Sequence, residues 1–348
     1  MTGRVLVARL DSAGDVLLAG PAVRAIAASA DEVWMLCSRL GAEAARMLPG
    51  VDRVLVWDCP WITADAPAAT PAHLARLAEL VAEAAPEVAV VLTSFHQSPL
   101  PLALQLRLAG VPRIAGASVD HAGALLDVRL RPGEDFPEDQ PESVRALTIA
   151  AAAGFALPRG DDGALAVRGV GSPPAALDGM RDLVVVHPGA SVPARTWPAE
   201  HHAETVRLLR ASGRDVVVTG APSERALTAA VSGDGAHALD LGGATDLPGL
   251  AAILAAADVV VVGNTGPAHL AAAVGTPVVS LFAPVVPAAR WAPHGVPCIV
   301  LGDQNAACHD TRATRCPVPG HPCLSLVQPE DVVAACERLA PARVGATA

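Results

Sequence analysis

The chain has 348 residues, enough for more than one domain, and 52% of them are hydrophobic, so it can bury a large core. Its formal net charge of −10 argues against a broad surface for nucleic-acid phosphates, and we expect no nucleic-acid partner. Residues 1–10 contain Arg4 and Arg9 and do not resemble a secretion signal. The uncharged stretch 270–289 is interrupted by prolines, so it does not suit a membrane span. We therefore expect a soluble, cytoplasmic protein, for which a loose contact with a membrane surface stays open.

The first half of the chain alternates short hydrophobic runs with segments of helical spacing. Strands are expected at 4–9, 32–37, 54–57, 88–92 and 113–116, and helices at 16–28, 71–85, 102–109 and 141–154. Pro21 predicts a kink or a restart within the first helix. Residues 129–142, rich in proline and acidic residues, are expected to form a loop. Strands that alternate with helices are typical of a parallel, doubly wound α/β sheet.

A stretch rich in Gly, Pro and Asp, residues 157–174, predicts a linker before a second alternating series. Strands are then expected at 183–187, 215–219, 238–240, 259–262 and 278–282, and helices at 199–212, 223–231, 247–257, 266–274 and 329–339. We therefore expect two Rossmann-like domains, at 1–168 and 180–328, followed by a C-terminal helix and tail at 329–348. A ligand site is expected between two such halves.

Asp15 lies where the first strand ends and the first helix begins, in the stretch Asp-Ser-Ala-Gly-Asp at 11–15. A carboxylate in this position can take a proton from a hydroxyl group. The positive end of the helix dipole favours the ionised carboxylate, which suits a base better than an acid. The alternative is that Asp15 only caps or favours the start of the helix.

A second candidate follows the strand at 183–187, where the sequence reads His-Pro-Gly-Ala-Ser and then Arg-Thr-Trp-Pro at 195–198. Gly189 and Ala190 form a small-residue loop, and Ser191 and Arg195 follow it. The guanidinium of Arg195 can grip a phosphate in a fork, and the Ser191 hydroxyl can add a hydrogen bond. The alternative is an exposed arginine beside a capping serine.

A third candidate, Asn264 to His269, follows the run of four valines at 259–262. Thr265 can cap a helix, Gly266 follows it, and Pro267 suits an early helix position. The first N–H groups of the helix and its dipole offer a seat for an anion. The alternative is an ordinary turn between a strand and a helix, with a structural His269.

Three cysteines gather near the end of the chain, at 308, 316 and 323, together with His309 and His321. These residue types can ligate zinc, but their spacing matches no pair of Cys-x-x-Cys knuckles. We therefore expect a reduced structural cluster, no metal and no cofactor. No Asp-x-Asp triplet occurs in the chain.

Four segments carry a family resemblance when taken together. They are Leu-Asp-Ser-Ala-Gly-Asp-Val-Leu at 10–17 with Pro-Ala-Val-Arg at 21–24, the two stretches at 187–191 and 195–198, Gly-Asn-Thr-Gly-Pro-Ala-His-Leu-Ala-Ala-Ala at 263–273, and Cys-Pro-Val-Pro-Gly-His-Pro-Cys at 316–323. In this order, along nearly the whole chain, they resemble glycosyltransferase family 9, the ADP-heptose:lipopolysaccharide heptosyltransferases. The resemblance implies a GT-B fold, in which two Rossmann-like domains face a cleft and the C-terminal domain holds most of the donor.

The resemblance also implies a metal-free, inverting transfer of a sugar, heptose by family default, from a nucleotide-diphosphate donor such as ADP-heptose. The acceptor is then a hydroxyl on a glycolipid, a glycan or a metabolite. By the same resemblance, Asp15 is the general base. The donor-binding residues it implies are Gly189, Ala190, Ser191, Arg195, Asn264, Thr265, Gly266, Pro267 and His269.

Two positions depart from the family pattern. The best-known members carry Lys where this chain has Arg195, a change that keeps the charge and adds a fork. They carry a carboxylate where this chain has Asn264, whose amide binds sugar hydroxyls without charge. The loops 59–70, 94–99 and 117–123 are expected to shape the acceptor side.

Two rival functions stay open, a nucleotide-sugar epimerase and a non-catalytic binder of sugar nucleotides. A nicotinamide dehydrogenase is not favoured, because no predicted strand is followed by Gly-x-Gly-x-x-Gly.

Overall fold

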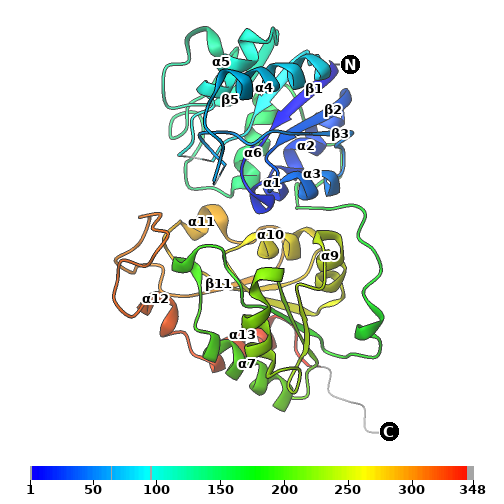
Figure 1. The fold of residues 1–348 in the computed structure, drawn as a ribbon, viewed down its shortest axis with the longest axis vertical. Helices are drawn as coiled ribbons and strands as arrows, with labels where there is room; N and C mark the ends of the chain where they lie inside the picture. Colours follow the sequence, from blue (N-terminus) through cyan, green and yellow to red (C-terminus); the bar gives the residue numbers. More distant parts are fainter. Residues whose placement is uncertain (1, 64, 95, 343–348) are drawn as a thin grey trace. The chain divides into compact units, whose positions relative to one another are not determined.

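The computed structural model describes residues 2–63, 65–94 and 96–342, and it divides into two compact units, Met1–Arg168 and Gly169–Ala348. We call them unit 1 and unit 2. Each contains a six-stranded sheet of parallel strands with helices around it (Figure 1). No helix in the described ranges is long and apolar enough to cross a membrane.

Unit 1 has its first strand in the middle of the sheet, in the order β3-β2-β1-β4-β5-β6. Its strands are β1 (Thr2–Ala8), β2 (Ala30–Cys37), β3 (Arg53–Val56), β4 (Val88–Val91), β5 (Arg113–Ala117) and β6 (Val128–Leu130). Its α-helices are α1 (Ala13–Leu18), α2 (Gly20–Ala27), α3 (Ala42–Met47), α4 (Pro71–Ala84), α5 (Leu100–Leu108) and α6 (Glu142–Ala152). All the strands predicted in this half of the chain are therefore present.

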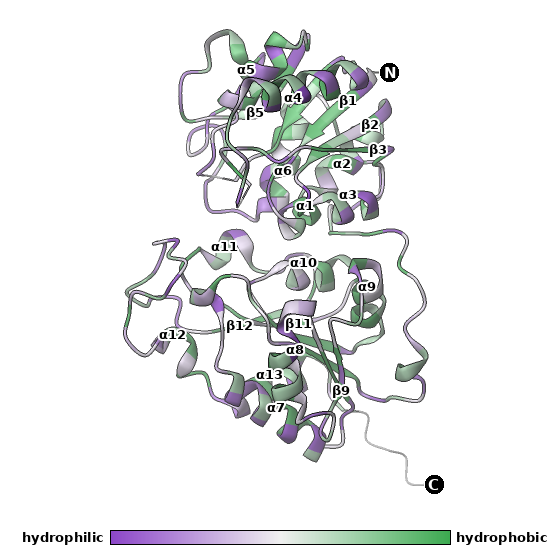
Figure 2. Cartoon of the chain, in the orientation of Figure 1, coloured by the Kyte–Doolittle hydropathy of each residue, from purple (hydrophilic) through white to green (hydrophobic). Residues whose placement is uncertain are grey.

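The central strands are hydrophobic on both faces because helices cover both sides of a doubly wound sheet. On one face, Leu6 and Ala8 of β1 belong to one core cluster with Leu77 of α4 and Leu106 of α5. Val7, which alternates with them, is also fully buried. Figure 2 accordingly draws these strands largely in the green of hydrophobic residues.

Unit 1 differs from the sequence prediction in three places. The helix expected at 16–28 breaks at Ala19 into α1 and α2, and Pro21 lies in the first turn of α2, so the proline marks a restart. The predicted loop 129–142 overlaps β6, a three-residue edge strand too short to show a pattern. The helix α3 was also missed, because six residues do not establish a helical period.

Unit 2 repeats the same strand order, β12-β11-β10-β7-β8-β9. Its strands are β7 (Val184–His187), β8 (Val216–Gly220), β9 (Leu239–Gly242), β10 (Val259–Gly263), β11 (Val278–Leu281) and β12 (Cys298–Leu301). Its α-helices are α7 (Ala199–Ala211), α8 (Arg225–Ser232), α9 (Leu247–Ala256), α10 (Gly266–Ala273), α11 (Ala288–Trp291), α12 (Pro322–Ser325) and α13 (Pro329–Leu339). Sequence patterns missed β12, α11 and α12, each of four residues. The C-terminal helix α13 packs on α7 and contributes Val332 and Ala335 to the core of unit 2.

Both sheets therefore reverse their strand order at one place, between β1 and β4 in unit 1 and between β7 and β10 in unit 2. Connections leave in opposite directions at such a point, and the carboxyl ends of the two strands border a crevice where α/β proteins bind ligands. The stretches after these four strands are consequently the first places to search for a site.

Candidate active site

Asp15 lies at the carboxyl end of β1, in the first turn of α1, as the sequence predicts. Its Oδ2 accepts hydrogen bonds from the hydroxyl and the backbone N–H of Ser12, at 2.8 and 3.3 Å, and the bond from the N–H belongs to the capping box that starts α1. The contact expected if Asp15 caps the start of the helix is thus present. The side chain is 23% exposed, so a substrate can still reach the carboxylate.

Arg9, one residue past β1, is 2% exposed and contacts three carboxylates. Its Nε lies 2.8 Å from Asp11, its Nη2 donates to Asp15 Oδ1 at 3.1 Å, and its Nη1 lies 3.5 Å from Glu142. The Nη2 group also donates to the Ser94 hydroxyl at 2.8 Å. Sequence reasoning missed this cluster. The sequence did contain a signal for it: Arg9 directly follows a buried strand, and Asp11 and Asp15 come two and six positions later.

Burial governs the charges of this cluster. Burial raises the pKa of Asp11 to about 6, and it raises the pKa of Glu142 above its usual range. Burial alone would lower the pKa of Arg9, but the carboxylates around it hold that pKa above its ordinary value. The cluster therefore keeps its cation, and the pKa values of Asp11 and Glu142 both lie above their ordinary values.

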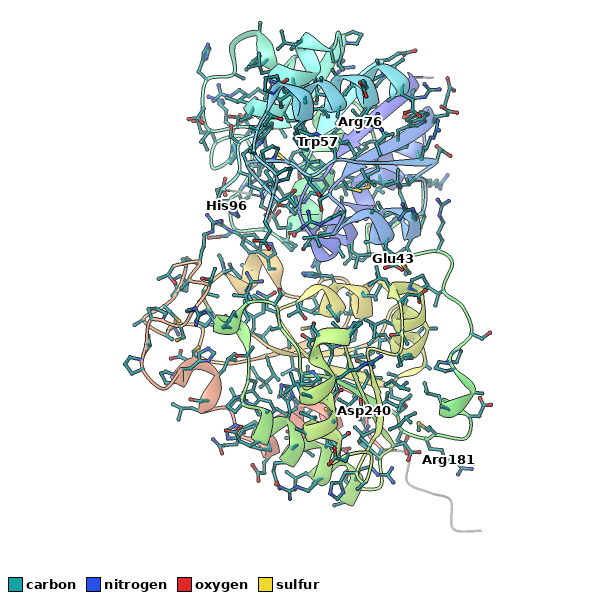
Figure 3. All side chains as sticks on the ribbon, in the orientation of Figure 1. Glu43, Trp57, Arg76, His96, Arg181 and Asp240 are labelled. Atoms are coloured by element: carbon teal, nitrogen blue, oxygen red, sulfur yellow. The ribbon has the colours of Figure 1, made fainter. Side chains whose placement is uncertain are left out.

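A cavity of about 180 Å³ opens beside the cluster. It is lined by His96, Gln97, Ser98, Ala117, Ser118, Val119, Asp120, Pro132 and Arg145. Gln97 lines the cavity and donates its Nε2 to Asp11 Oδ1, so the cavity and the carboxylates share one side chain. Figure 3 shows the side chain of His96, which belongs to the same loop.

Two of the three loops expected on the acceptor side, 94–99 and 117–123, thus meet in one cavity. The loop 59–70 contributes none of its lining residues. Residues 64 and 95, which belong to these loops, lie outside the described residues.

In unit 2, the loop after β7 approaches a carboxylate. A Cβ atom on Gly189 would lie 2.1 Å from Oε1 of Glu224, so glycine permits this close approach. The Glu224 carboxylate also accepts the N–H of Ala221 at 2.8 Å. Ala190 is half-buried and Ser191 is exposed. Sequence reasoning missed Glu224. Because its carboxylate is negative, it suits a ligand hydroxyl group beside Gly189 better than a ligand phosphate.

The second and third sequence candidates meet at the reversal point of unit 2. β7 and β10 are neighbours, with His187 paired to Val262, and Arg195 donates its Nη1 to the Asn264 carbonyl at 3.3 Å. Trp197 is buried and donates to the carbonyl of Val327 at 3.2 Å, so it packs in the core. Arg195 itself is half-buried, and its charge lies beside the loop that opens α10.

The start of α10 combines partly exposed and buried residues. Thr265 occupies the N-cap position, although its hydroxyl makes no cap bond and lies 3.4 Å from the Gly263 carbonyl. Gly266 and Pro267 are half-buried, whereas His269 is buried in the helix. The Asn264 side chain is 3% exposed, and its Nδ2 has no hydrogen-bond partner among the described residues. A buried amide N–H without a hydrogen-bond partner lowers the stability of the fold. Such groups are rare in folded proteins and often mark functional sites.

Within the described residues, no group of three or more His, Cys, Asp or Glu side chains could hold a metal ion. Cys308 and Cys323 are buried free thiols, and burial, with the neighbouring Cys308, raises the pKa of Cys323 to about 12. A larger cavity of about 430 Å³ lies among β12, α12 and α13; Cys323 lines it, whereas Asp15 and the candidate donor-binding residues do not.

The family whose sequence model matches the chain is glycosyltransferase family 9 (heptosyltransferase), over residues 103–320. The match includes the unit 2 candidates, and Asp15 precedes it. Lipopolysaccharide heptosyltransferase 2 of Salmonella typhimurium is 33% identical over 117 residues, which cover 32% of this chain and 34% of the relative. The chain thus aligns with about a third of that protein's length.

Two solved structures share the fold over 97% of this chain. A glycosyl transferase family 9 protein from Veillonella parvula superposes with a TM-score of 0.77 at 18% identity, over 96% of its own length. The E. coli heptosyltransferase WaaC with ADP-2-deoxy-2-fluoro heptose superposes with a TM-score of 0.72 at 21% identity, over its full length. The expected architecture, two Rossmann-like domains of the GT-B type, is confirmed.

Proposed function

Because this chain belongs to glycosyltransferase family 9, we propose that it transfers a sugar, with inversion and without a metal, from a nucleotide-diphosphate donor to a hydroxyl acceptor. The proposed donor is ADP-heptose, the nucleotide sugar whose fluorinated analogue accompanies the E. coli enzyme of the same fold. The observation that carries the proposal is the contact between Arg195 and the Asn264 loop at the reversal point of unit 2. This contact joins the stretches at 195–198 and 263–273, and both lie within the residues that match the family model.

Unit 2 supplies groups suited to a donor. The Arg195 guanidinium and the Ser191 hydroxyl bind the diphosphate, and the N–H groups that open α10 add further donors. The Asn264 amide and the Glu224 carboxylate bind hydroxyl groups of the donor. As the sugar leaves, the diphosphate gathers negative charge, and a fixed cation with oriented N–H groups stabilises that charge.

Unit 1 supplies the base. The acceptor occupies the cavity beside Gln97 and gives the proton of its hydroxyl to Asp15. The oxygen then forms a bond with the anomeric carbon on the face opposite the diphosphate. The bond between that carbon and the diphosphate oxygen breaks, and its electron pair leaves with the diphosphate. One displacement of this kind inverts the anomeric centre.

Replacing Asp15 with Asn tests this proposal. The amide oxygen can still accept the Ser12 hydrogen bonds, so the helix start is kept while the basicity is lost. We expect turnover to fall by about 100-fold or more, with donor affinity near the wild-type value. Asp331→Asn is the matched control, because Asp331 occupies the equivalent capping position in α13.

The measurement is nucleoside-diphosphate release from a panel of nucleotide sugars with candidate acceptors, together with calorimetric donor affinity. An Asp15→Asn variant that turns over within a few-fold of wild type removes Asp15 from the mechanism. A wild-type chain that binds a nucleotide sugar and transfers it to no acceptor would favour the non-catalytic binder, and conversion of the donor alone would favour the epimerase.

A further inference from the structure

Arg9 takes no part in the steps above, yet it is buried and contacts three carboxylates. Its side chain is 3% exposed and lies within 3.5 Å of Asp11, Asp15 and Glu142. A second buried cation, Arg145, acts on Glu142 and lies 3.6 Å from Glu138. Two arginines therefore serve four carboxylates.

The contacts of Arg9 divide between two sides of its guanidinium group. Nε and Nη2 form one edge, and this edge meets Asp11 and Asp15. The third nitrogen, Nη1, points to Glu142. Asp11 and Asp15, which are partly exposed, therefore lie along the same edge of the guanidinium group, and the buried Glu142 lies on its other side.

Both oxygens of Asp15 are held. Oδ1 accepts from Arg9, and Oδ2 accepts from the Ser12 hydroxyl and N–H. Bonds to both oxygens fix the plane of a carboxylate. A base needs such a direction, because proton transfer depends on hydrogen-bond geometry in the reacting complex.

Arg9 is itself held by a second acceptor. The Ser94 hydroxyl, which is buried, accepts from Nη2, the same nitrogen that donates to Asp15. A lysine could bring the same charge, but its single ammonium group cannot reproduce a planar group whose Nη2 donates to Asp15 and Ser94 while Nε and Nη1 lie beside Asp11 and Glu142. The contacts of Arg9 therefore require both a guanidinium group and this buried position.

We propose that Arg9 is a positioning residue for the transfer reaction, which fixes the direction and the charge of the Asp15 carboxylate through the guanidinium edge shared with Asp11. The inference rests on the proposed role of Asp15 as the base. Glu142 and Ser94 hold Arg9 in place and do not touch the substrate.

Carboxyl titration tests the first half of the proposal without any substrate. In the full chain labelled with carboxyl-¹³C aspartate, the Asp11 and Asp15 resonances are assigned with the Asp11→Asn and Asp15→Asn variants. In Arg9→Met, loss of the cation should move the midpoints of both resonances to higher pH by about one unit or more. Arg24→Lys is the control, since it breaks a forked pair with Asp161 elsewhere in unit 1. Unchanged midpoints in Arg9→Met would overturn the proposal.

Turnover tests the second half. Arg9→Lys keeps the charge and loses the fork, so we expect kcat to fall by about tenfold or more, with donor affinity unchanged and Arg24→Lys near wild type. Ser94→Ala keeps every charge and is the fallback if the Arg9 variants do not fold; it should lower kcat by a few-fold and leave donor affinity unchanged. Wild-type kcat in both Arg9→Lys and Ser94→Ala would overturn the positioning role. A chain that transfers no sugar would refute the proposed function, whereas the titration would still decide what Arg9 does to Asp15.

Discussion

The raised pKa of Asp11 makes the stability of unit 1 depend on pH. Burial raises its pKa to about 6, whereas the ordinary value is 3.8. The folded chain therefore binds this proton more tightly than the unfolded chain does. The contribution of Asp11 is fully present below pH 4 and is lost as the pH rises through 6, so the free energy of unfolding falls over this range.

The size of the effect follows from the gap between the two pKa values. A gap of about two pH units corresponds to about 3 kcal/mol, since one unit is worth about 1.4 kcal/mol. Asn at position 11 has no proton to lose, and its neutral amide can still accept hydrogen bonds. We therefore expect Asp11→Asn to gain about 3 kcal/mol relative to wild type between pH 4 and pH 7.

Hydrogen exchange of the β1 amides across a urea series measures this free energy within unit 1. The control is Asp161→Asn, because the hydrogen bond from Arg24 holds the pKa of Asp161 below its ordinary value. Its stability contribution is present above pH 4 and is lost only as the pH falls below that value, so from pH 4 to pH 7 this variant should be less stable than wild type by a nearly constant amount. A difference between Asp11→Asn and wild type that stays constant from pH 4 to pH 7, or that favours wild type as the pH rises, would refute the reasoning.

Two further predictions concern the donor and the metal. Arg195→Ala should weaken nucleoside-diphosphate binding by about ten- to a hundredfold, because a charged hydrogen bond is worth about 1.5–3 kcal/mol; unchanged calorimetric affinity would place the phosphates elsewhere. Addition of EDTA should leave turnover unchanged, because the chain lacks an Asp-x-Asp triplet. Activity that is lost with chelator and restored by Mg²⁺ or Mn²⁺ would contradict the metal-free scheme.

The sequence by itself determined the kind of most elements and the places of the candidate residues. The run Val259–Val262 with Gly266 and Pro267 predicted β10 and the start of α10, because hydrophobic runs and helix-start residues act over a few positions. Asp15 was likewise recognised at the start of a helix. Such patterns are local, so a single stretch of chain contains the whole signal.

Only the tertiary structure decided which of these stretches meet. The partner of Asp11 in the cavity, Gln97, lies 86 positions away, and Arg195 contacts a carbonyl 69 positions away. The strand order places β1 beside β4 and β7 beside β10, and no local pattern encodes that order. The short edge strands β6 and β12 were missed for the same reason, since pairing with a neighbouring strand defines them. Contacts between distant residues depend on how whole elements pack, and a period read along the chain does not contain that information.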